Sequence, residues 1–433
     1  MNRVTITKAI LILSVLILTD FFGLLGESIL ILGIPTTDIP IIIAAVYCIV
    51  TFKEIRNRIT PIHKIIVAYL VVVTLTIVSM PFREEESILQ AFQVGRHYYL
   101  LLLAFVVDDN IFYSGSKDFI KKLIYWGGLY YTSIAIINYF YPDFVSTYLP
   151  GLRGERDLTS GTLSRNYITD NNGVLFVHLS FLYKSFETLC SHEKKIIDIS
   201  LSFFFLAGML LVGLRAPLFG SVAAFGLIFV VMSSKFAETH TVGGISQIKY
   251  FALSLLAVLV FNELSGGVIS NFTDTIINDV SAKTELKKNT FRGREKRAMA
   301  YQIPRVREQP MFGIGFIYKN TKAASKYGYK NTESRYYSLY NMDFGYGTMW
   351  VSFGIIGSII IMFSIFLAIQ YCLKLSKREI TPELLQCAAL LIAFSACNYT
   401  WAVLEFSRGL FALSLCLGLA NEIALSIKES ESI

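Results

Sequence analysis

Charged residues are scarce in this chain, at 16% of 433 residues, whereas hydrophobic residues make up 54%. Soluble domains carry about a quarter charged residues, so the composition argues against a soluble globular enzyme and against a disordered chain. The mean hydropathy is +0.54, and the apolar residues lie in long runs. This pattern indicates a membrane protein with several spans, since one spanning helix needs about 20 apolar residues.

Cysteine is also rare, and the nucleotide-binding glycine motifs are missing. The six cysteines lie in apolar runs or at their ends and form no CxxC pair, which argues against a disulfide framework or a zinc site. We interpret them as small apolar fillers. The sequence has no Walker A motif and no Gly-x-Gly-x-x-Gly after a strand, so nothing indicates ATP. We expect no cofactor.

The hydropathy pattern predicts an all-α, polytopic integral membrane protein of about twelve transmembrane helices. It divides into an N-terminal bundle of about nine helices (1–265), a large outer loop (266–345) and C-terminal helices (346–433). The bundle includes a shorter outer loop at 142–171. The predicted spans are 8–32, 38–53, 62–80, 88–107, 119–141, 172–190, 196–213, 216–233, 247–265, 346–373, 383–402 and 405–427.

The distribution of basic residues predicts the orientation, because Lys and Arg concentrate in short cytoplasmic loops. One set of short links carries fifteen of them, whereas the opposite set carries Arg83 and Arg215, with three glutamates beside Arg83. Both termini are therefore expected in the cytoplasm and both long loops outside. The fifteen are Lys53, Arg56, Arg58, Lys64, Lys117, Lys121, Lys122, Lys184, Lys194, Lys195, Lys235, Lys249, Lys374, Lys377 and Arg378.

The long outer loop, 266–345, has the same net charge as the whole chain. Its 80 residues include 14 Lys or Arg, 7 Asp or Glu and seven tyrosines, a net charge of +7. Long loops escape the positive-inside rule, so a solvated surface is one explanation. We favour an anionic, sugar-bearing ligand, because arginine binds phosphate bidentately and an aromatic ring offers a face to a sugar.

Two arginines lie within or between predicted spans on the outer side. Arg96 lies inside the span 88–107, eight residues from its outer end. An arginine at that depth costs several kcal/mol unless it is paired or hydrated, so it has either a function or a structural partner such as Asp20 or Glu27. Arg215 lies in a tight hairpin between two apolar runs, where its side chain can snorkel to the surface or bind an anion.

Other outer segments carry polar residues that have two interpretations each. Arg156 begins a polar stretch that runs to Gly161, which is either a plain turn or part of a site. Asp343 is expected at the outer membrane surface, as a general base or as a helix N-cap. Glu405 and Arg408 open the last span, as a structural ion pair or as part of the site.

Four of these segments, in this order, resemble motifs of the bacterial O-antigen polymerase and O-antigen ligase superfamily. The resemblance covers about residues 150–360 and includes one large outer loop between many helices. The matching residues are Arg156, Gly161 and Asn172; Arg215-Ala216; Gly293-Arg294 with Pro310 to Gly315; and Asp343-Phe344 before Gly354-Ile355-Ile356-Gly357.

Two departures from the family pattern favour its polymerase branch. Asp343 stands where the ligase has a histidine, and polymerases vary more at that position. The tryptophan that usually follows Gly-Arg is absent, and the nearest aromatic residue is Tyr301.

The resemblance implies a GT-C-like enzyme of the bacterial inner membrane with its active site at the periplasmic face. Its substrates are oligosaccharide repeat units linked to undecaprenyl diphosphate, and it transfers the growing glycan to the next unit while releasing undecaprenyl diphosphate. The resemblance and the residue chemistry give catalytic roles to Asp343 as base and to Arg215 and Arg294 at the leaving diphosphate. Candidates for binding diphosphate or glycan are Arg96, Arg156, Arg297, Arg305, Arg335, Tyr337 and Arg408.

Direct displacement predicts inversion at the anomeric carbon. The outer loops contain no DxD-type pair, so we expect a metal-independent reaction. Expected partners are membrane lipids, a flippase and a chain-length regulator, but not nucleic acid. One alternative is an O-antigen ligase that transfers glycan to lipid A-core. Another is a lipid-oligosaccharide flippase or other transporter, although the chain shows no matching halves of the kind that transporters often have.

Overall fold

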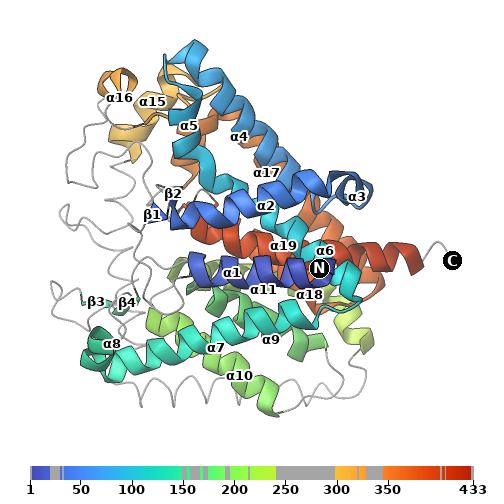
Figure 1. Ribbon diagram of the computed structural model, residues 1–433. Coiled ribbons are helices and arrows are strands. Elements are labelled where there is room, and N and C mark those ends of the chain that lie inside the picture. The colour runs from blue at the N-terminus through green and yellow to red at the C-terminus, as the bar shows by residue number, and fades with distance from the viewer. Residues whose placement is uncertain are drawn as a thin grey trace.

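The computed structural model describes residues 2–19, 30–31, 34–148, 154–156, 166–168, 174–190, 196–212, 215–239, 298–318, 321–327, 345–399, 402–404 and 406–430. These residues form one helical bundle with two short antiparallel ribbons at its edge (Figure 1). The predicted all-α architecture is therefore correct for the described part, apart from the two ribbons.

The first part of the chain supplies most of the helices on one flank of the bundle. Its elements are α1 (Arg3–Leu18), β1 (Leu30–Ile31), β2 (Ile34–Pro35), η1 (Thr36–Asp38), α2 (Ile39–Val50), α3 (Phe52–Asn57), α4 (Lys64–Arg83), α5 (Ile88–Gly95), η2 (Arg96–Leu102), α6 (Leu103–Ser114), α7 (Asp118–Phe140) and α8 (Pro142–Tyr148).

The second part adds the central helices and the described pieces of the long loop. Its elements are β3 (Gly154–Arg156), β4 (Asn166–Ile168), α9 (Val174–Cys190), α10 (Ile196–Val212), α11 (Arg215–Thr239), η5 (Ala298–Gln302), α15 (Ile303–Glu308), α16 (Lys322–Lys326), α17 (Gly345–Arg378), α18 (Pro382–Cys397) and α19 (Ser407–Ser430).

Helices coincide with most of the predicted spans. Eleven of the twelve predicted ranges overlap a described helix, and the twelfth, 247–265, lies outside the described residues. By length and composition, the segments Lys64–Arg83, Gly345–Arg378 and Gly409–Ser430 are long and apolar enough to cross a membrane. Several further helices are apolar but shorter. The chain is thus built as a membrane protein, while the number twelve stays a prediction.

The fourth predicted span, 88–107, is wrong as a single α-helix. The chain forms α5, then the tighter 3-10 helix η2, and then α6, which continues to Ser114 and ends at Gly115 in the left-handed conformation. The change falls at Gly95, where the ring of Phe316 packs so closely that a Cβ atom would lie 2.6 Å from it. The close ring and the low helix propensity of glycine account for the interruption at this point.

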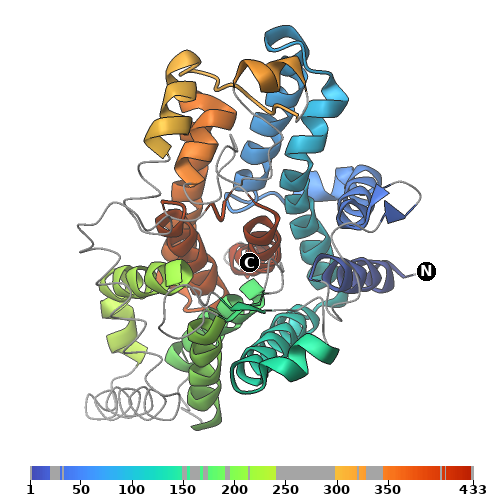
Figure 2. The ribbon, with the colours of Figure 1, turned by 90° about the vertical axis from the view of Figure 1, so that its left-hand side faces the viewer.

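Two central helices organise the packing. α18 lies against α9, α11, α17 and α19, and α19 lies in turn against α6 and η2 (Figure 2). α4 and α17 pack together at one flank and expose large apolar side chains outward, among them Leu75, Ile359 and Phe363, each 58–65% exposed. In a soluble protein such a surface would be costly, whereas in a bilayer it faces acyl chains.

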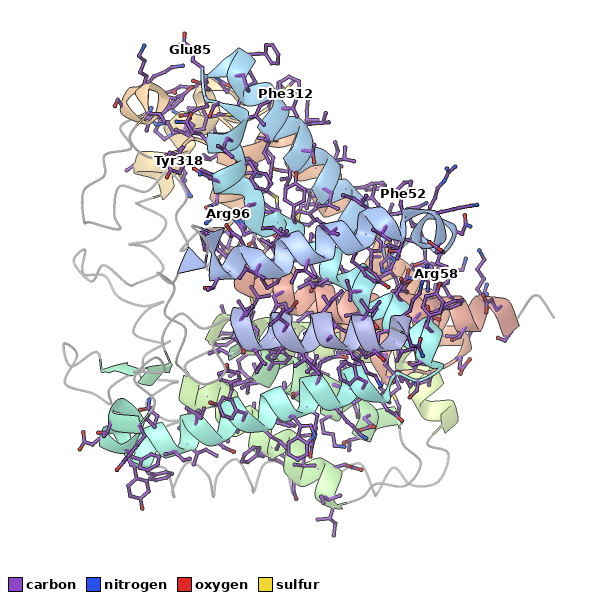
Figure 3. All side chains as sticks on the ribbon, viewed as in Figure 1. Phe52, Arg58, Glu85, Arg96, Phe312 and Tyr318 are labelled. Carbon is purple, nitrogen blue, oxygen red and sulfur yellow. The ribbon has the colours of Figure 1, made fainter. Side chains whose placement is uncertain are left out.

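A buried polar cluster lies at the end of the bundle opposite Arg96 (Figure 3). Arg58 forms ion pairs with Asp108 and Asp109, both of which are buried. Tyr47 donates a hydrogen bond to Asp109 Oδ2 at 2.6 Å, and Asn421 donates to Asp108 Oδ1 at 2.8 Å. Charges removed from water need such partners, so the cluster joins α2, α6 and α19 through polar contacts.

Replacing Tyr47 with phenylalanine is expected to destabilise the protein by about 2 kcal/mol, because a buried carboxylate loses a hydrogen-bond donor. The measurement is thermal unfolding of the purified protein in one detergent. Tyr141→Phe is the matched control, since Tyr141 is 69% exposed, and its midpoint should equal that of the wild type. Equal midpoints for the Tyr47 variant and the control would contradict this account of the cluster.

Candidate functional site

The first residues of α11 and α17 lie at the same end of the bundle because α18 connects them. α11 packs so closely along α18 that a Cβ atom at Gly220 would lie 2.9 Å from Ala393 Cα. α18 then ends at Cys397, and the carbonyl of Asn398 accepts a hydrogen bond from the Tyr346 amide at 3.1 Å. The start of α17 is thereby held at the end of α18.

The first residues of η2 and α19 lie at this end as well. The side-chain oxygen of Asn398 accepts the amide of Leu404 at 3.3 Å, just before α19 begins. The ring of His97, in the first turn of η2, stacks on Phe406 with centroids 6.3 Å apart and planes 9° apart. The start of α17 and the segment that leads into α19 therefore both bond to Asn398, which is fully buried, and the first turn of η2 stacks against that segment.

Three predicted site arginines occupy the first or second position of a helix. Arg96 is the first residue of η2, Arg215 the first of α11 and Arg408 the second of α19. Asp343 precedes Gly345, the first residue of α17, by two positions in the chain. A free helix N-terminus carries partial positive charge, which applies to α11, α17 and α19 but not to η2, because η2 continues directly from α5. Together with arginines, such N-termini suit an anionic group at a membrane surface.

Most other predicted site residues lie outside the described structure. The side chains of Arg215 and Arg408 are not described, nor is that of Arg156, whose backbone ends strand β3. The remaining predicted residues outside the described part of the chain are Arg294, Arg297, Arg335, Tyr337 and Asp343, together with Glu405.

Arg96 has a carboxylate partner that the sequence analysis did not name. Its Nε lies 2.6 Å from Asp38 Oδ1, and its Nη1 donates to the Gln93 carbonyl at 2.9 Å. The expected partners, Asp20 and Glu27, lie outside the described residues. Asp38 precedes α2, which packs on η2, so it reaches Arg96 from a neighbouring element. The pair favours the structural interpretation of Arg96.

Arg305 lies near the end of α4 and the short helix α16 rather than at the starts of α17 and α19. Its Nη1 is 2.6 Å from Glu308 Oε1, and its guanidinium carbon is 5.7 Å from the ring centre of Tyr327. Tyr327 in turn donates a hydrogen bond to Glu84. Binding of substrate by Arg305 stays a prediction, and its described contacts lie within the protein.

We call the contacts between the end of α4 and residues 309–327 the outer latch, after the outer side of the membrane on which the sequence analysis predicts these residues. Glu84, a buried carboxylate, accepts hydrogen bonds from Tyr327 at 2.6 Å and from Gln309 at 2.5 Å, and forms an ion pair with Lys326 at 2.9 Å. Arg83 donates to the Gln309 side chain and to the Gly313 carbonyl. The latch therefore fixes part of the long loop to a membrane helix.

The two glycine motifs of the sequence form one structural unit, which we call the clasp: residues 310–314 and 351–356. Gly354 interrupts α17 with φ +65° and ψ −170°. Around this break, the amides of Ile355 and Ile356 donate to the carbonyls of Pro310 and Met311 at 2.8 and 3.1 Å. The amide of Ile314 donates to the Val351 carbonyl at 2.8 Å. The motif residues are therefore adjacent and serve the backbone.

Glu86 gives the outer latch a dependence on pH. It accepts a hydrogen bond from Thr321, and burial raises the pKa of its carboxyl above the ordinary value. A raised pKa adds stability at low pH, which is lost as the pH rises from the ordinary Glu pKa through the raised one. Glu86→Gln is therefore expected to gain stability relative to the wild type as the pH rises from about 4.5 to 7. Thermal midpoints across this range test it, and a constant difference would contradict it.

A buried serine–histidine pair was missed in the sequence analysis. His178 Nε2 lies 2.7 Å from Ser221 Oγ, which also donates to the Pro217 carbonyl at 2.7 Å. Both residues are buried, and His178 Nδ1 has no partner among the described residues. The pair joins α9 to α11 six residues after Arg215. Only the occurrence of a histidine within a predicted span could have indicated it.

Within the described residues, no three His, Cys, Asp or Glu side chains are placed to hold a metal ion. In the comparison with known families, residues 200–362 match the model of the family described as O-antigen ligase. This range crosses both predicted domain boundaries and covers most of α10, all of α11 and the clasp. No curated protein matches the chain. The match covers less than half of the chain, and over residues 200–362 the protein is similar to this family.

Proposed function

We propose that this protein is a polysaccharide polymerase of the bacterial inner membrane. It joins oligosaccharide repeat units that are linked to undecaprenyl diphosphate, at the periplasmic ends of its helices. The observation that carries the proposal is the bonding of the start of α17 and of the segment before α19 to Asn398, within a chain whose residues 200–362 match the O-antigen ligase family. Arg408 lies in the first turn of α19, and an arginine at a helix N-terminus suits a diphosphate.

The proposed reaction is a direct displacement at the anomeric carbon of the donor glycan. A hydroxyl of the acceptor sugar forms the new bond, and its proton passes to the carboxylate of Asp343. The bond from the anomeric carbon to the diphosphate breaks, with inversion. Arg215 and Arg294 stabilise the charge that develops on the leaving diphosphate, because arginine stays charged and binds two oxygens at once.

One property of the chain favours polymerisation over the related ligase reaction. By the resemblance described in the sequence analysis, Asp343 stands where a ligase has a histidine. The long outer loop carries a net charge of +7, which suits a site for two anionic lipid-linked substrates. The proposed partners are a flippase, which supplies the lipid-linked repeat units, and a chain-length regulator, which controls the length of the polymer.

The test uses purified protein in nanodiscs and lipid-linked repeat units extracted from a polymerase-deficient strain of the source organism. A ladder of longer lipid-linked glycans, formed without lipid A-core and unaffected by EDTA, is the expected result. Product formed only when lipid A-core is added would identify a ligase. Folded protein that yields neither product would overturn the proposal. Retention of the anomeric configuration in the new linkage would contradict the proposed inverting mechanism.

A further inference from the structure

We propose that Arg83 is a positioning residue for the reaction proposed above. Arg83 holds the segment 309–314, on which the outer half of α17 rests, and this half-helix directly follows Asp343 in the chain. The inference depends on the proposed function only for the role of Asp343. Arg83 lies outside the residues 200–362 that match the family model.

Arg83 binds three oxygens of a single segment. At the last position of α4, its guanidinium donates to the side-chain oxygen of Gln309, to the Gly313 carbonyl and, at 3.5 Å, to the Phe312 carbonyl. Figure 3 shows Phe312 beside the outer end of α4. The Gly313 amide bonds the Gln309 carbonyl at 2.9 Å, which closes the turn that Arg83 surrounds. One side chain thus fixes the shape of the turn.

This turn replaces hydrogen bonds that α17 lacks at its break. In a continuous helix the amides of Ile355 and Ile356 would bond to residues 351 and 352. Here they bond to Pro310 and Met311 instead, and the freed Val351 carbonyl accepts the Ile314 amide. Unpaired backbone groups are costly in a low-dielectric environment. The direction of the outer half of α17 is therefore determined by where segment 309–314 lies.

The outer half of α17, residues 345–353, is short, so its position depends on the segment 309–314 that bonds to it. The inner half, residues 355–378, has 24 residues and at 1.5 Å per residue is ~36 Å long, sufficient to cross the membrane alone. The other bonds described for the outer half run from Gln302 to Thr348 at 3.1 Å, from the Tyr346 amide to the Asn398 carbonyl at 3.1 Å and from the Tyr346 hydroxyl to the Ser395 carbonyl at 2.6 Å. A shift of the turn would displace the outer half of α17, beginning at the break.

The role requires a guanidinium more than a positive charge. Its planar fork reaches separate oxygens at fixed angles, whereas the lysine ammonium is a single point. We expect Arg83→Gln to lower kcat ~30-fold with KM within twofold, since misplacement of a catalytic group reduces rate rather than binding. Arg83→Lys should recover part of kcat. The matched control is Arg307→Gln, because Arg307 is exposed in the same loop.

Two measurements separate positioning from general destabilisation. Hydrogen exchange of the protein in nanodiscs should become faster in Arg83→Gln over residues 345–356 and stay unchanged over α18. Gly354→Ala disturbs the same clasp, so the double variant should lose no more kcat than the worse of the two single variants. The proposal would be overturned if the kcat of the double variant fell by the product of the two single losses. Faster hydrogen exchange throughout the protein in Arg83→Gln would also overturn it.

The outcomes also separate this inference from the proposed function. If the wild type makes no polymer from the extracted repeat units, the polymerase proposal fails. In that case the exchange measurement still tests whether Arg83 holds the outer half of α17. If the wild type polymerises and Arg83→Gln keeps the wild-type kcat, the positioning role is wrong and the polymerase proposal stands. A rise in KM alone would also contradict positioning, because it would assign Arg83 to substrate binding.

Discussion

Asp343→Ala is expected to lower the rate of glycan transfer at least 100-fold, with little change in the amount of folded protein in the membrane. A positioned general base contributes about 10²–10⁴-fold to a rate, and the reaction proposed here needs one at the acceptor hydroxyl. The measurement is the initial rate of polymer formation in nanodiscs at saturating repeat unit. Asp343→Asn should be as slow as the alanine variant, because an amide cannot take the proton.

Arg215 allows a graded version of the same experiment. Arg215→Ala should lower the rate ~100–1,000-fold, the range seen when one electrostatic donor to a transition state is removed. Arg215→Lys should fall between alanine and wild type, since lysine keeps the charge but loses the fork. Arg307→Gln serves as the control, and its rate should equal that of the wild type. If Asp343→Ala and Arg215→Ala both polymerise at the wild-type rate, the assigned site is wrong.

The helices were predictable because hydropathy depends on local composition. Long apolar runs located α4, α17 and α19 within a few residues of their observed bounds. The same method predicted one helix over 88–107, because the run is continuous in sequence while the interruption at Gly95 depends on a distant aromatic ring. A contact with Phe316, more than two hundred residues away in the chain, is not visible in a local window.

The sequence identified the glycine motifs as important segments, but their structural role could not be predicted from it. The sequence analysis selected Pro310 to Gly315 and Gly354 to Gly357 on resemblance to a family. The structure places the two together, with residues 310–314 bonded to the broken backbone of α17. A glycine in a sequence indicates that an unusual backbone is allowed. It does not indicate which other segment fills the gap.

Electrostatic partners were the least predictable feature. As the structural alternative for Arg96, the sequence analysis named Asp20 or Glu27 of the first predicted span, yet Asp38 holds it from the start of α2. The pairing depends on how η2 lies against α2, which is a tertiary property. The sequence analysis considered Arg83 only as one of the basic residues on the predicted outer side, although in the structure it binds three oxygens.

The clasp makes Gly354 the position where the smallest change should cost the most stability. Its φ of +65° with ψ −170° lies in a region that is essentially restricted to glycine. A Cβ atom there would also overlap the backbone at Gly313 and Met311, which belongs to a turn that Arg83 holds in place. Neither the helix nor the turn can move away without losing the hydrogen bonds of Ile355 and Ile356.

Gly354→Ala is therefore expected to destabilise the protein by about 3 kcal/mol, the upper range for a residue forced into a strained backbone. Thermal unfolding in nanodiscs should show a lower midpoint, with hydrogen exchange accelerated first over residues 345–356. Gly226→Ala is the matched control: a Cβ atom at Gly226 meets no atom within 4 Å, and alanine in a helix is neutral or stabilising. Equal midpoints for the two variants would show that the break at Gly354 does not depend on glycine, and the clasp could then not be what directs the outer half of α17.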